Sequence, residues 1–109
     1  MIESAIERAF KVAVEARGGI CLKLGVTYQN GMPDRFVLMP DGVCAFVELK
    51  QKGKKPRAIQ KWQHRRLEAL GFRVFVLDRT SMIESTIAQI MNEHVEQNAD
   101  EHVKGEPTA

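Results

Sequence analysis

The sequence predicts an α/β domain in which helices flank a mixed β-sheet. Four short runs rich in β-branched or aromatic residues predict strands, and three longer segments with apolar residues at helical spacing predict helices. Their order along the chain is α-β-β-β-α-β-α. At 109 residues the chain can form one domain with a single hydrophobic core, which we place at residues 1–97.

The first helix and three strands are expected in the first half of the chain. Gly18 and Gly19 end the helix, and five apolar residues share one of its faces: Ile2, Ile6, Ala9, Phe10 and Ala13. Strands are expected at residues 20–24, 35–39 and 44–50, because Gly, Pro or Asp bounds each of these runs.

The second half of the chain predicts a helix, a strand at residues 73–77 and a last helix. Pro56 is expected at the first position of the middle helix, Gly71 stops it, and its apolar stripe is Ile59, Trp62, Leu67 and Leu70. A capping box from Ser81 to Glu84 is expected to open the last helix, whose apolar residues are Ile83, Ile87, Ile90 and Met91. Residues 98–109 are expected to form a disordered acidic tail.

Composition limits the class of protein. Hydrophobic residues make up 44% and charged residues 28% of the chain, which is ordinary for a soluble globular domain. No apolar run approaches the roughly 18 residues of a membrane span, and the acidic start is unlike a signal peptide. We therefore expect a cytoplasmic protein without membrane contact. Cys21 and Cys44 lie in apolar runs and are interpreted as core thiols rather than zinc ligands.

Basic residues are concentrated in the middle of the chain. The formal net charge is +2, but residues 93–109 hold five acidic side chains against one lysine, so the rest of the chain is clearly basic. Eight of the 16 basic residues fall between positions 50 and 66: Lys50, Lys52, Lys54, Lys55, Arg57, Lys61, Arg65 and Arg66. Such a cluster suits phosphate binding, and a solvated loop and helix face would explain it about equally well.

The turn at residues 39–43 predicts which charged residues meet on the sheet. Pro40 and Gly42 suit a short hairpin loop that pairs Met39 with Val43. Continued along the antiparallel ladder, this register places Asp34 opposite Glu48, with Lys50 on the same face.

Two carboxylates at cross-strand distance destabilise a sheet unless a cation lies between them, and Mg²⁺ or Mn²⁺ prefers such oxygen ligands. Taken singly, Asp34 could cap a turn, and Glu48 and Lys50 could alternate outward on a half-exposed strand. Taken together, the aligned acids, the lysine and the basic cluster downstream favour a catalytic site.

Several short stretches match one known family. Gly31, Pro33, Asp34 and Arg35 are followed by Val47, Glu48, Leu49 and Lys50, then by Gln60 and Gly71. In this combination, residues 1–78 resemble the virus-type replication-repair nuclease (VRR-NUC) domain of the PD-(D/E)xK nuclease superfamily. The resemblance implies a restriction-endonuclease-like core and Mg²⁺- or Mn²⁺-dependent hydrolysis of DNA. Branched DNA, such as the Holliday junctions of DNA repair, is the expected substrate.

The resemblance also assigns roles to residues. Asp34 and Glu48 match the metal-binding acids, Lys50 the catalytic lysine and Gln60 an accompanying helix glutamine. The Leu49 carbonyl and a glutamate of the first helix, either Glu3 or Glu7, would complete the metal site. Expected DNA contacts are Arg35, Lys52, Lys54, Lys55, Arg57, Lys61, His64 and Arg65. A solvated position is expected for His64, and a core position for Trp62 and Phe10.

Two other functions and one assembly were considered. The domain could be a nucleic-acid-binding or assembly module without catalysis, but such a module has no need of a paired Asp34 and Glu48. A nucleotide-hydrolysing enzyme is disfavoured, because no P-loop occurs. We expect a homodimer, since one small domain offers one site and one basic stretch. Its interface would come from the last helix, Ile83 to Met91, or from Tyr28 in the loop at residues 25–32.

Overall fold

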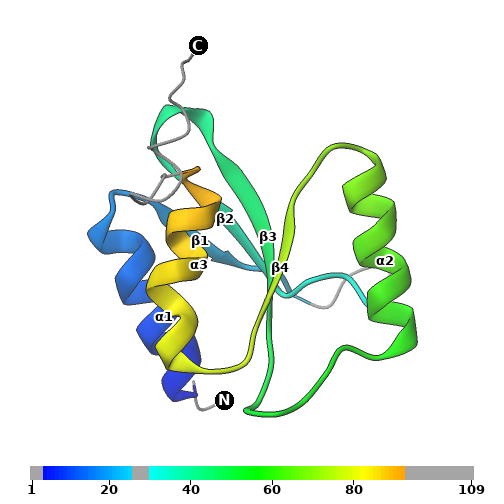
Figure 1. Ribbon diagram of the computed structural model, residues 1–109. Helices are drawn as coiled ribbons and strands as arrows, with labels where there is room; N and C mark the ends of the chain where they lie inside the picture. The colour runs from blue at the N-terminus through cyan, green and yellow to red at the C-terminus, as the bar shows by residue number, and fades with distance from the viewer. Residues whose placement is uncertain (1–3, 26–29, 93–109) are drawn as a thin grey trace, which may run out of the picture.

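Four strands form one mixed sheet in the computed structural model, which describes residues 4–25 and 30–92 (Figure 1). The strands lie side by side in chain order: β1 (Ile20–Lys23), β2 (Arg35–Leu38), β3 (Cys44–Leu49) and β4 (Val74–Leu77). β1, β2 and β3 pair antiparallel, and β4 pairs parallel to β3. The predicted order of elements and the mixed α/β class are confirmed.

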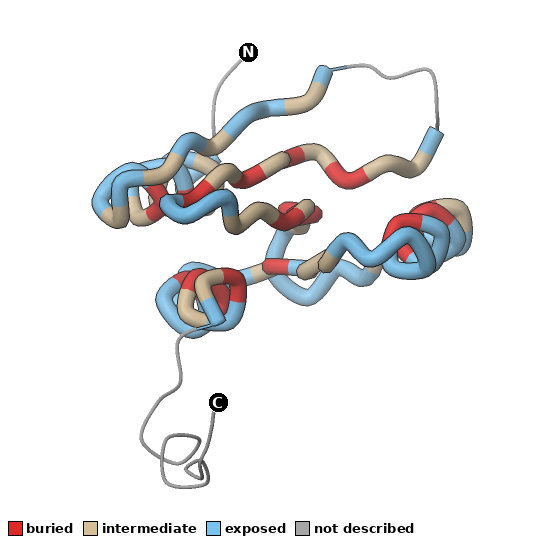
Figure 2. Tube along the Cα trace, turned by 90° about the horizontal axis from the view of Figure 1, so that it is seen from above, coloured by how far each residue is buried: buried red, intermediate tan, exposed pale blue. Residues whose placement is uncertain are grey.

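Helices cover the two faces of this sheet unequally. α1 (Ala5–Ala16) and α3 (Ile83–Ile90) lie side by side on one face, and α2 (Ala58–Ala69) lies apart from them on the other (Figure 1). The hydrophobic core fills the space between the sheet and the α1–α3 pair, and its fully buried members include Phe10, Val14, Val37, Ala45, Val47, Leu77, Ile87 and Ile90. Figure 2 shows that burial concentrates on the central strands, while β1 is largely exposed.

A capping box that the sequence analysis did not predict starts α1. The Glu7 backbone N–H donates to the Ser4 hydroxyl at 3.2 Å, and the Ser4 backbone N–H donates to the Glu7 carboxylate at 2.8 Å. The apolar face of the helix then buries Phe10 and Val14 in the core. The capping box thus fixes the position of Glu7 at the start of the helix.

The β2–β3 hairpin has the predicted register. The Met39 N–H donates to the Val43 carbonyl at 2.7 Å, and Phe36 lies opposite Phe46 with ring centroids 4.7 Å apart. Gly42 is left-handed as predicted, with φ of 75°, and Asp41 is left-handed as well, with φ of 66°. Asp tolerates this conformation better than most residues, because its short side chain can bond locally.

The expected apolar stripe of α2 is only partly correct, because Leu67 is buried and Ile59 half-buried but the other two residues are not. Trp62 is 48% exposed and Leu70 is 74% exposed, whereas the helix buries Gln60, Gln63, His64 and Leu67. α2 also begins at Ala58, with Arg57 at its N-cap, so Pro56 precedes the helix. The helix packs a mostly polar face toward the sheet, which the usual apolar periodicity does not reveal.

The expected capping box of α3 is also wrong. A 3₁₀ turn at Thr80–Met82 leads into the helix, and no side chain caps its N-terminus. Glu84 instead forms an ion pair with Arg17 of α1 at 3.4 Å. The chain enters α3 directly from a 3₁₀ turn, so this helix starts without the side-chain cap that the sequence predicted.

Other expectations concern smaller features. Cys21 and Cys44 are free thiols and are half-buried rather than core residues. In the part of the chain that the structure describes, no helix is long and apolar enough to cross a membrane. The expectations for Glu3, Tyr28 and the tail at residues 98–109 lie outside the described residues.

Candidate active site

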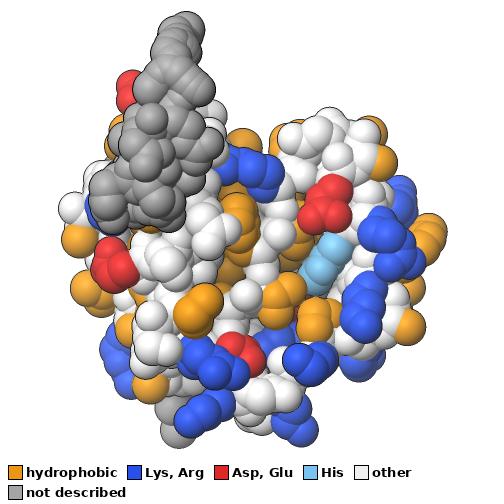
Figure 3. Space-filling model, in the orientation of Figure 1, with side chains coloured by type: hydrophobic (Ala, Val, Ile, Leu, Met, Phe, Trp, Pro, Cys, Tyr) orange, Lys and Arg blue, Asp and Glu red, His pale blue; other side chains and the backbone are white. Residues whose placement is uncertain are grey.

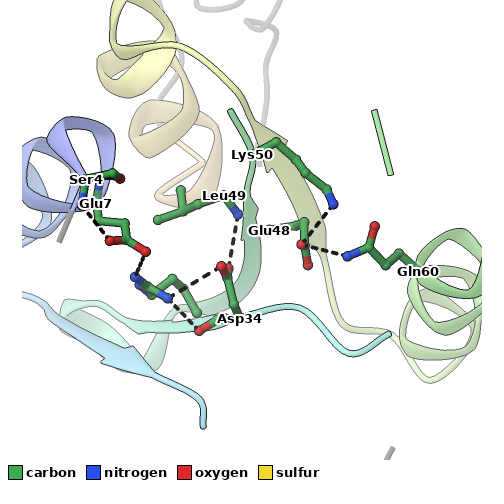
Figure 4. A network of polar contacts seen from close by, with 8 residues as sticks. Ser4, Glu7, Asp34, Glu48, Leu49, Lys50 and Gln60 are labelled. Carbon is green, nitrogen blue, oxygen red and sulfur yellow. Dashed lines mark hydrogen bonds and ion pairs between the residues drawn. The ribbon is translucent and has the colours of Figure 1, made fainter. Parts of the chain in front are cut away.

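Asp34 and Glu48 meet on the sheet face that looks toward α2. Arg35 pairs with Val47 in the ladder, and the next step places Asp34 beside Glu48, as the turn predicted. The Leu49 backbone N–H donates to Oδ1 of Asp34 at 3.0 Å, which ties the residue before β2 to the end of β3 (Figure 4). The predicted convergence of the two carboxylates is therefore present in the fold.

Glu48 is buried, with one oxygen bonded and the other without a partner. Its side chain is 6% exposed, and Oε2 accepts a hydrogen bond from Nε2 of Gln60 at 3.0 Å. Nζ of Lys50 lies 3.7 Å from the same oxygen. Oε1 of Glu48 is buried and has no hydrogen-bond partner among the described residues. A buried carboxylate oxygen without a donor is costly, so this atom is a natural position for a cation or a bound water.

Burial and mutual repulsion make both carboxylates hard to ionise. Burial raises the pKa of Asp34, although the Leu49 N–H and the Arg35 guanidinium counteract it. Burial, with Asp34 as the next cause, raises the pKa of Glu48 to about 7, despite the opposing charge of Lys50. Two neighbouring acids in this state would gain from a shared cation, since the cation favours their charged forms.

Gln60 connects the start of α2 to Glu48 on the sheet. Its Oε1 accepts the Arg57 backbone N–H at 2.7 Å, while its Nε2 donates to Glu48. These two bonds fix the orientation of the amide, because the oxygen and nitrogen have different partners. Gln60, which the resemblance assigned to the site, therefore acts on the Glu48 carboxylate.

Arg35 occupies a different place from the one expected. It is 4% exposed, and its Nη2 lies 2.9 Å from Oε2 of Glu7 and its Nη1 3.5 Å from Oδ2 of Asp34 (Figure 4). A buried guanidinium held by two carboxylates is not available to bind DNA. The expected DNA contact at Arg35 is therefore corrected: the residue joins α1 to the acid pair.

Glu7 is already engaged by hydrogen-bond donors at both oxygens. One accepts the Ser4 N–H and the other faces Arg35. The Ser4 N–H is the largest cause of the lowered pKa of Glu7, and Arg35 adds to it. In this arrangement Glu7 holds Arg35 and caps α1. Glu3, the other candidate from the first helix, lies outside the described residues.

α2 also supports the loop that leads to Asp34. Nε2 of Gln63 donates to the Asn30 carbonyl at 2.9 Å. Gly31 has φ of 89°, and a Cβ on it would lie 2.9 Å from the Ile59 carbonyl oxygen. The sequence analysis missed Gln63, although a second glutamine one turn after Gln60 was the available signal.

His64 is buried, not solvated as expected. Its exposed fraction is 8%, and its Nε2 has no hydrogen-bond partner among the described residues. Burial lowers the pKa of His64, Glu68 opposes this and Lys50 adds to it. The imidazole is therefore neutral near pH 7 and faces the same region as Gln60, one turn earlier. In this position it is not a surface contact for DNA phosphates.

Known proteins with similar sequence or structure define the family. No family profile matches the sequence. "Putative nuclease p44" of Acyrthosiphon pisum secondary endosymbiont phage 1 is 43% identical over 76 residues, which are 70% of this chain and 82% of the phage protein. A solved structure of a "VRR_NUC domain" is 34% identical, has a TM-score of 0.70 and covers 75% of this chain and 89% of its own. The chain belongs to the VRR-NUC nuclease family.

The expected resemblance to VRR-NUC nucleases is thus confirmed, and so is the fold class. Basic side chains of this nuclease are concentrated over α2 and the loop before it (Figure 3). Six of the predicted DNA contacts are exposed there: Lys52, Lys54, Lys55, Arg57, Lys61 and Arg65. Trp62, expected in the core, lies on the same helix with the Arg66 guanidinium 4.8 Å from its ring centroid. DNA contact by these exposed residues stays a prediction.

The acid pair of this VRR-NUC chain has the oxygen donors that a divalent cation prefers. Among residues 4–25 and 30–92, no three His, Cys, Asp or Glu side chains lie close enough together to hold a metal ion. The orphaned Oε1 of Glu48 and the raised pKa values of Asp34 and Glu48 nevertheless fit a divalent cation that takes oxygen ligands. The metal ligands predicted at Leu49 and Glu3 stay predictions.

Proposed function

We propose that this VRR-NUC nuclease hydrolyses phosphodiester bonds in DNA with Mg²⁺ or Mn²⁺, and that it prefers branched DNA, including Holliday junctions. One observation carries the catalytic part. Asp34 and Glu48 lie side by side with Lys50, and an oxygen of Glu48 is buried without a partner. A module that only binds nucleic acid would have no use for a buried Glu48 beside a half-buried Asp34, because their repulsion destabilises the fold.

Each residue of the site has a distinct part in the proposed reaction. Asp34 and Glu48, with the Leu49 carbonyl, would hold the cation, which when bound makes water a stronger nucleophile and offsets charge on the phosphate. Lys50 places its ammonium group next to Glu48, where it would stabilise negative charge that develops on the scissile phosphate. Gln60 holds the Glu48 carboxylate in one orientation from α2.

The proposed assembly is a homodimer, because one chain offers one acid pair and one basic stretch, whereas a junction presents strands related by symmetry. α3 is not a suitable interface, since Ile83, Ile87 and Ile90 are buried in the core. Apolar side chains that remain exposed include Ile20, Leu22, Phe72 and Val76. Sedimentation of the purified protein at micromolar concentration tests the dimer, and a monomer that cuts a single flap strand at full rate would refute it.

A substrate panel tests the activity. The purified protein is incubated with Mg²⁺ or Mn²⁺ and labelled linear duplex, flap, splayed-arm and four-way-junction DNA. We expect incision of the branched substrates several times faster than of the duplex. Equal incision of all substrates would refute the branch preference. Binding without incision under every condition would favour the non-catalytic module instead.

Single substitutions identify the catalytic residues. Asp34→Ala, Glu48→Ala and Lys50→Ala should each lower the incision rate by on the order of 100-fold or more, with DNA binding retained. Val12→Ala is the matched control, because Val12 is 60% exposed on α1 and contributes nothing to the site. A variant that cuts at the wild-type rate would remove its residue from the mechanism.

A further inference from the structure

A cavity of about 700 Å³ opens beside the acid pair, where the parallel strands β3 and β4 end. Three segments form its wall: the first turn of α1, the residues that follow β3 and the turn after β4. Lys50 belongs both to this wall and to the proposed catalytic site, so the cavity adjoins that site. Its volume falls in the range of about 300–1,000 Å³ that is usual for sites of small organic ligands.

The chemistry of the wall is apolar with one unbalanced cation. Ala5, Ile6 and Leu49 supply apolar surface, and the segment after β4 adds the Thr80 and Ser81 hydroxyls. Lys52 is exposed at this wall, and no described residue forms an ion pair with it. A ligand that fits this wall has a flat or apolar part and an anionic part, as a nucleotide does.

The two acidic residues in the wall, Glu7 and Asp78, do not cancel its attraction for an anionic ligand. Glu7 lies 2.9 Å from the Arg35 guanidinium, and Asp78 accepts from Arg79 at 2.9 and 3.2 Å. Each carboxylate therefore has its own arginine, which reduces its repulsion of an incoming phosphate. The cavity wall keeps a net attraction for an anion through Lys52.

Two hydrogen bonds fix the position of the cavity wall near Lys52. The Lys50 N–H donates to the Leu77 carbonyl at 2.9 Å, and the Gly53 N–H donates to Oδ2 of Asp78 at 3.3 Å. These bonds tie the chain after β3 to the end of β4 on either side of Lys52. A wall that is positioned before the ligand arrives loses little entropy on binding.

We propose that this cavity binds one unpaired nucleotide of the DNA substrate, next to the phosphate that Lys50 contacts. This inference rests on the proposed nuclease function and deepens it, because it supplies a physical source for the preference for branched DNA. A base inside a duplex must leave its stack and its partner before it enters such a cavity, which costs a few kcal/mol. A base in a single-stranded flap has no partner to lose, and a base pair at the open centre of a junction lacks a stacked neighbour on one side, so its base is easier to extrude.

Two substitutions at the rim test the inference by different means. Ser81→Trp adds bulk at an exposed position of the wall, and Lys52→Glu reverses the unbalanced charge. Matched controls make the same changes far from the cavity: Val12→Trp and Lys11→Glu, both at exposed positions of α1. Thermal unfolding confirms that each variant is folded before it is assayed.

The assay compares two substrates that differ only in one nucleotide, which is unpaired beside the cut site in one and base-paired in the other. Ser81→Trp should raise KM for the unpaired substrate about tenfold, with kcat and the cutting of the paired duplex changed much less. Lys52→Glu removes a predicted DNA contact, so it should raise KM for both substrates, and more for the unpaired one. The controls should keep the wild-type preference. The inference is overturned if both cavity variants retain the full preference for the unpaired substrate.

A binding measurement separates this inference from the nuclease function. Fluorescence anisotropy with a short single-stranded oligonucleotide and with its duplex, in the presence of a chelator, requires no hydrolysis. Weaker binding of the single strand by both cavity variants, with unchanged binding by the controls, supports the cavity even if the wild-type protein cuts no DNA. Unchanged single-strand binding by both cavity variants refutes it, whatever the nuclease assay shows.

Discussion

Glu48 is the residue of the site whose burial most disfavours folding. It is buried beside Asp34, it bonds Gln60 with one oxygen, and its other oxygen has no partner among the described residues. Residues that disfavour folding but persist in a family's fold are usually kept for chemistry. The site should therefore be more stable when either a proton or a cation neutralises this carboxylate.

The stability of the metal-free protein should depend on pH through Glu48. Its pKa is raised from 4.5 to about 7, so folding favours the protonated form, and the contribution is full below about pH 4.5 and lost as pH rises through about 7. The loss corresponds to on the order of 3 kcal/mol in the free energy of unfolding. Urea unfolding with a chelator at pH 5 and 7.5 measures it. Glu48→Gln should remove most of the dependence, and an unchanged slope in that variant would contradict the assignment.

Gln60→Glu tests the amide that orients Glu48. The substitution keeps the size of the side chain and an acceptor for the Arg57 N–H, but it replaces the donor to Glu48 with a further negative charge. The pKa of Glu48 should rise further, so the pH at which cutting reaches half its maximum should move upward. A pH–rate profile measures the shift, and coincident profiles for wild type and variant would argue against this role.

The turn at residues 39–43 made the acid pair predictable, because an antiparallel register follows from the hairpin loop. Burial could not be predicted for side chains whose neighbours come from distant segments of the chain. Arg35 is buried because Glu7 of α1 reaches it, and His64 is buried because α2 turns it toward the sheet. Nothing in the local sequence of either residue indicates these neighbours.

At the scale of elements, α2 differs from an ordinary amphipathic helix. It buries Gln60, Gln63 and His64, and two of these hold other parts of the site by hydrogen bonds. The apolar residues of this helix predicted its position in the sequence, but they did not predict that polar side chains would be buried on it. Apolar periodicity indicates which side of a helix faces a hydrophobic core, and α2 faces the site instead.

Gly31 should be essential for the close approach of the loop to α2. Its φ is 89°, and an added Cβ would lie 2.9 Å from the Ile59 carbonyl oxygen. Gly31→Ala should therefore lower the free energy of unfolding by on the order of 1–3 kcal/mol and displace Asp34. Gly25→Ala is the matched control, because an added Cβ there meets nothing within 4 Å. Urea unfolding of both variants decides, and equal effects would rule out the steric argument.

At the scale of the whole molecule, the described residues of the chain share one hydrophobic core. Among residues 4–25 and 30–92, the buried members of this core cluster run from Phe10 to Ile90. The Arg73 guanidinium also holds the end of α3, donating to the Gln89 carbonyl at 2.9 Å and to the Ile90 carbonyl at 2.7 Å. The order of elements along the chain and the register of the β2–β3 hairpin could be predicted from the sequence. The positions of β1 and β4 in the sheet could not, because no short turn joins either of them to its neighbour.

Removal of residues 98–109 should leave folding and cutting unchanged, because the sequence of this tail has no apolar periodicity. The midpoint of thermal unfolding and the rate of junction incision measure the two properties. A chain ending at residue 97 is compared with the full chain at equal concentration. A collapsed unfolding transition or lost solubility in the shorter chain would show that the tail belongs to the domain.

We propose that the amide of Gln60 couples DNA binding to binding of the proposed cation. α2 carries exposed basic residues on one side and, through Gln60, grips the Glu48 carboxylate on the other. If DNA draws α2 against the sheet, it presets Glu48 for a cation, and a bound cation must then strengthen DNA binding by the same factor. Mg²⁺ should therefore tighten DNA binding more in the wild type than in Gln60→Ala. Equal tightening in both would show that DNA and cation bind independently of this amide.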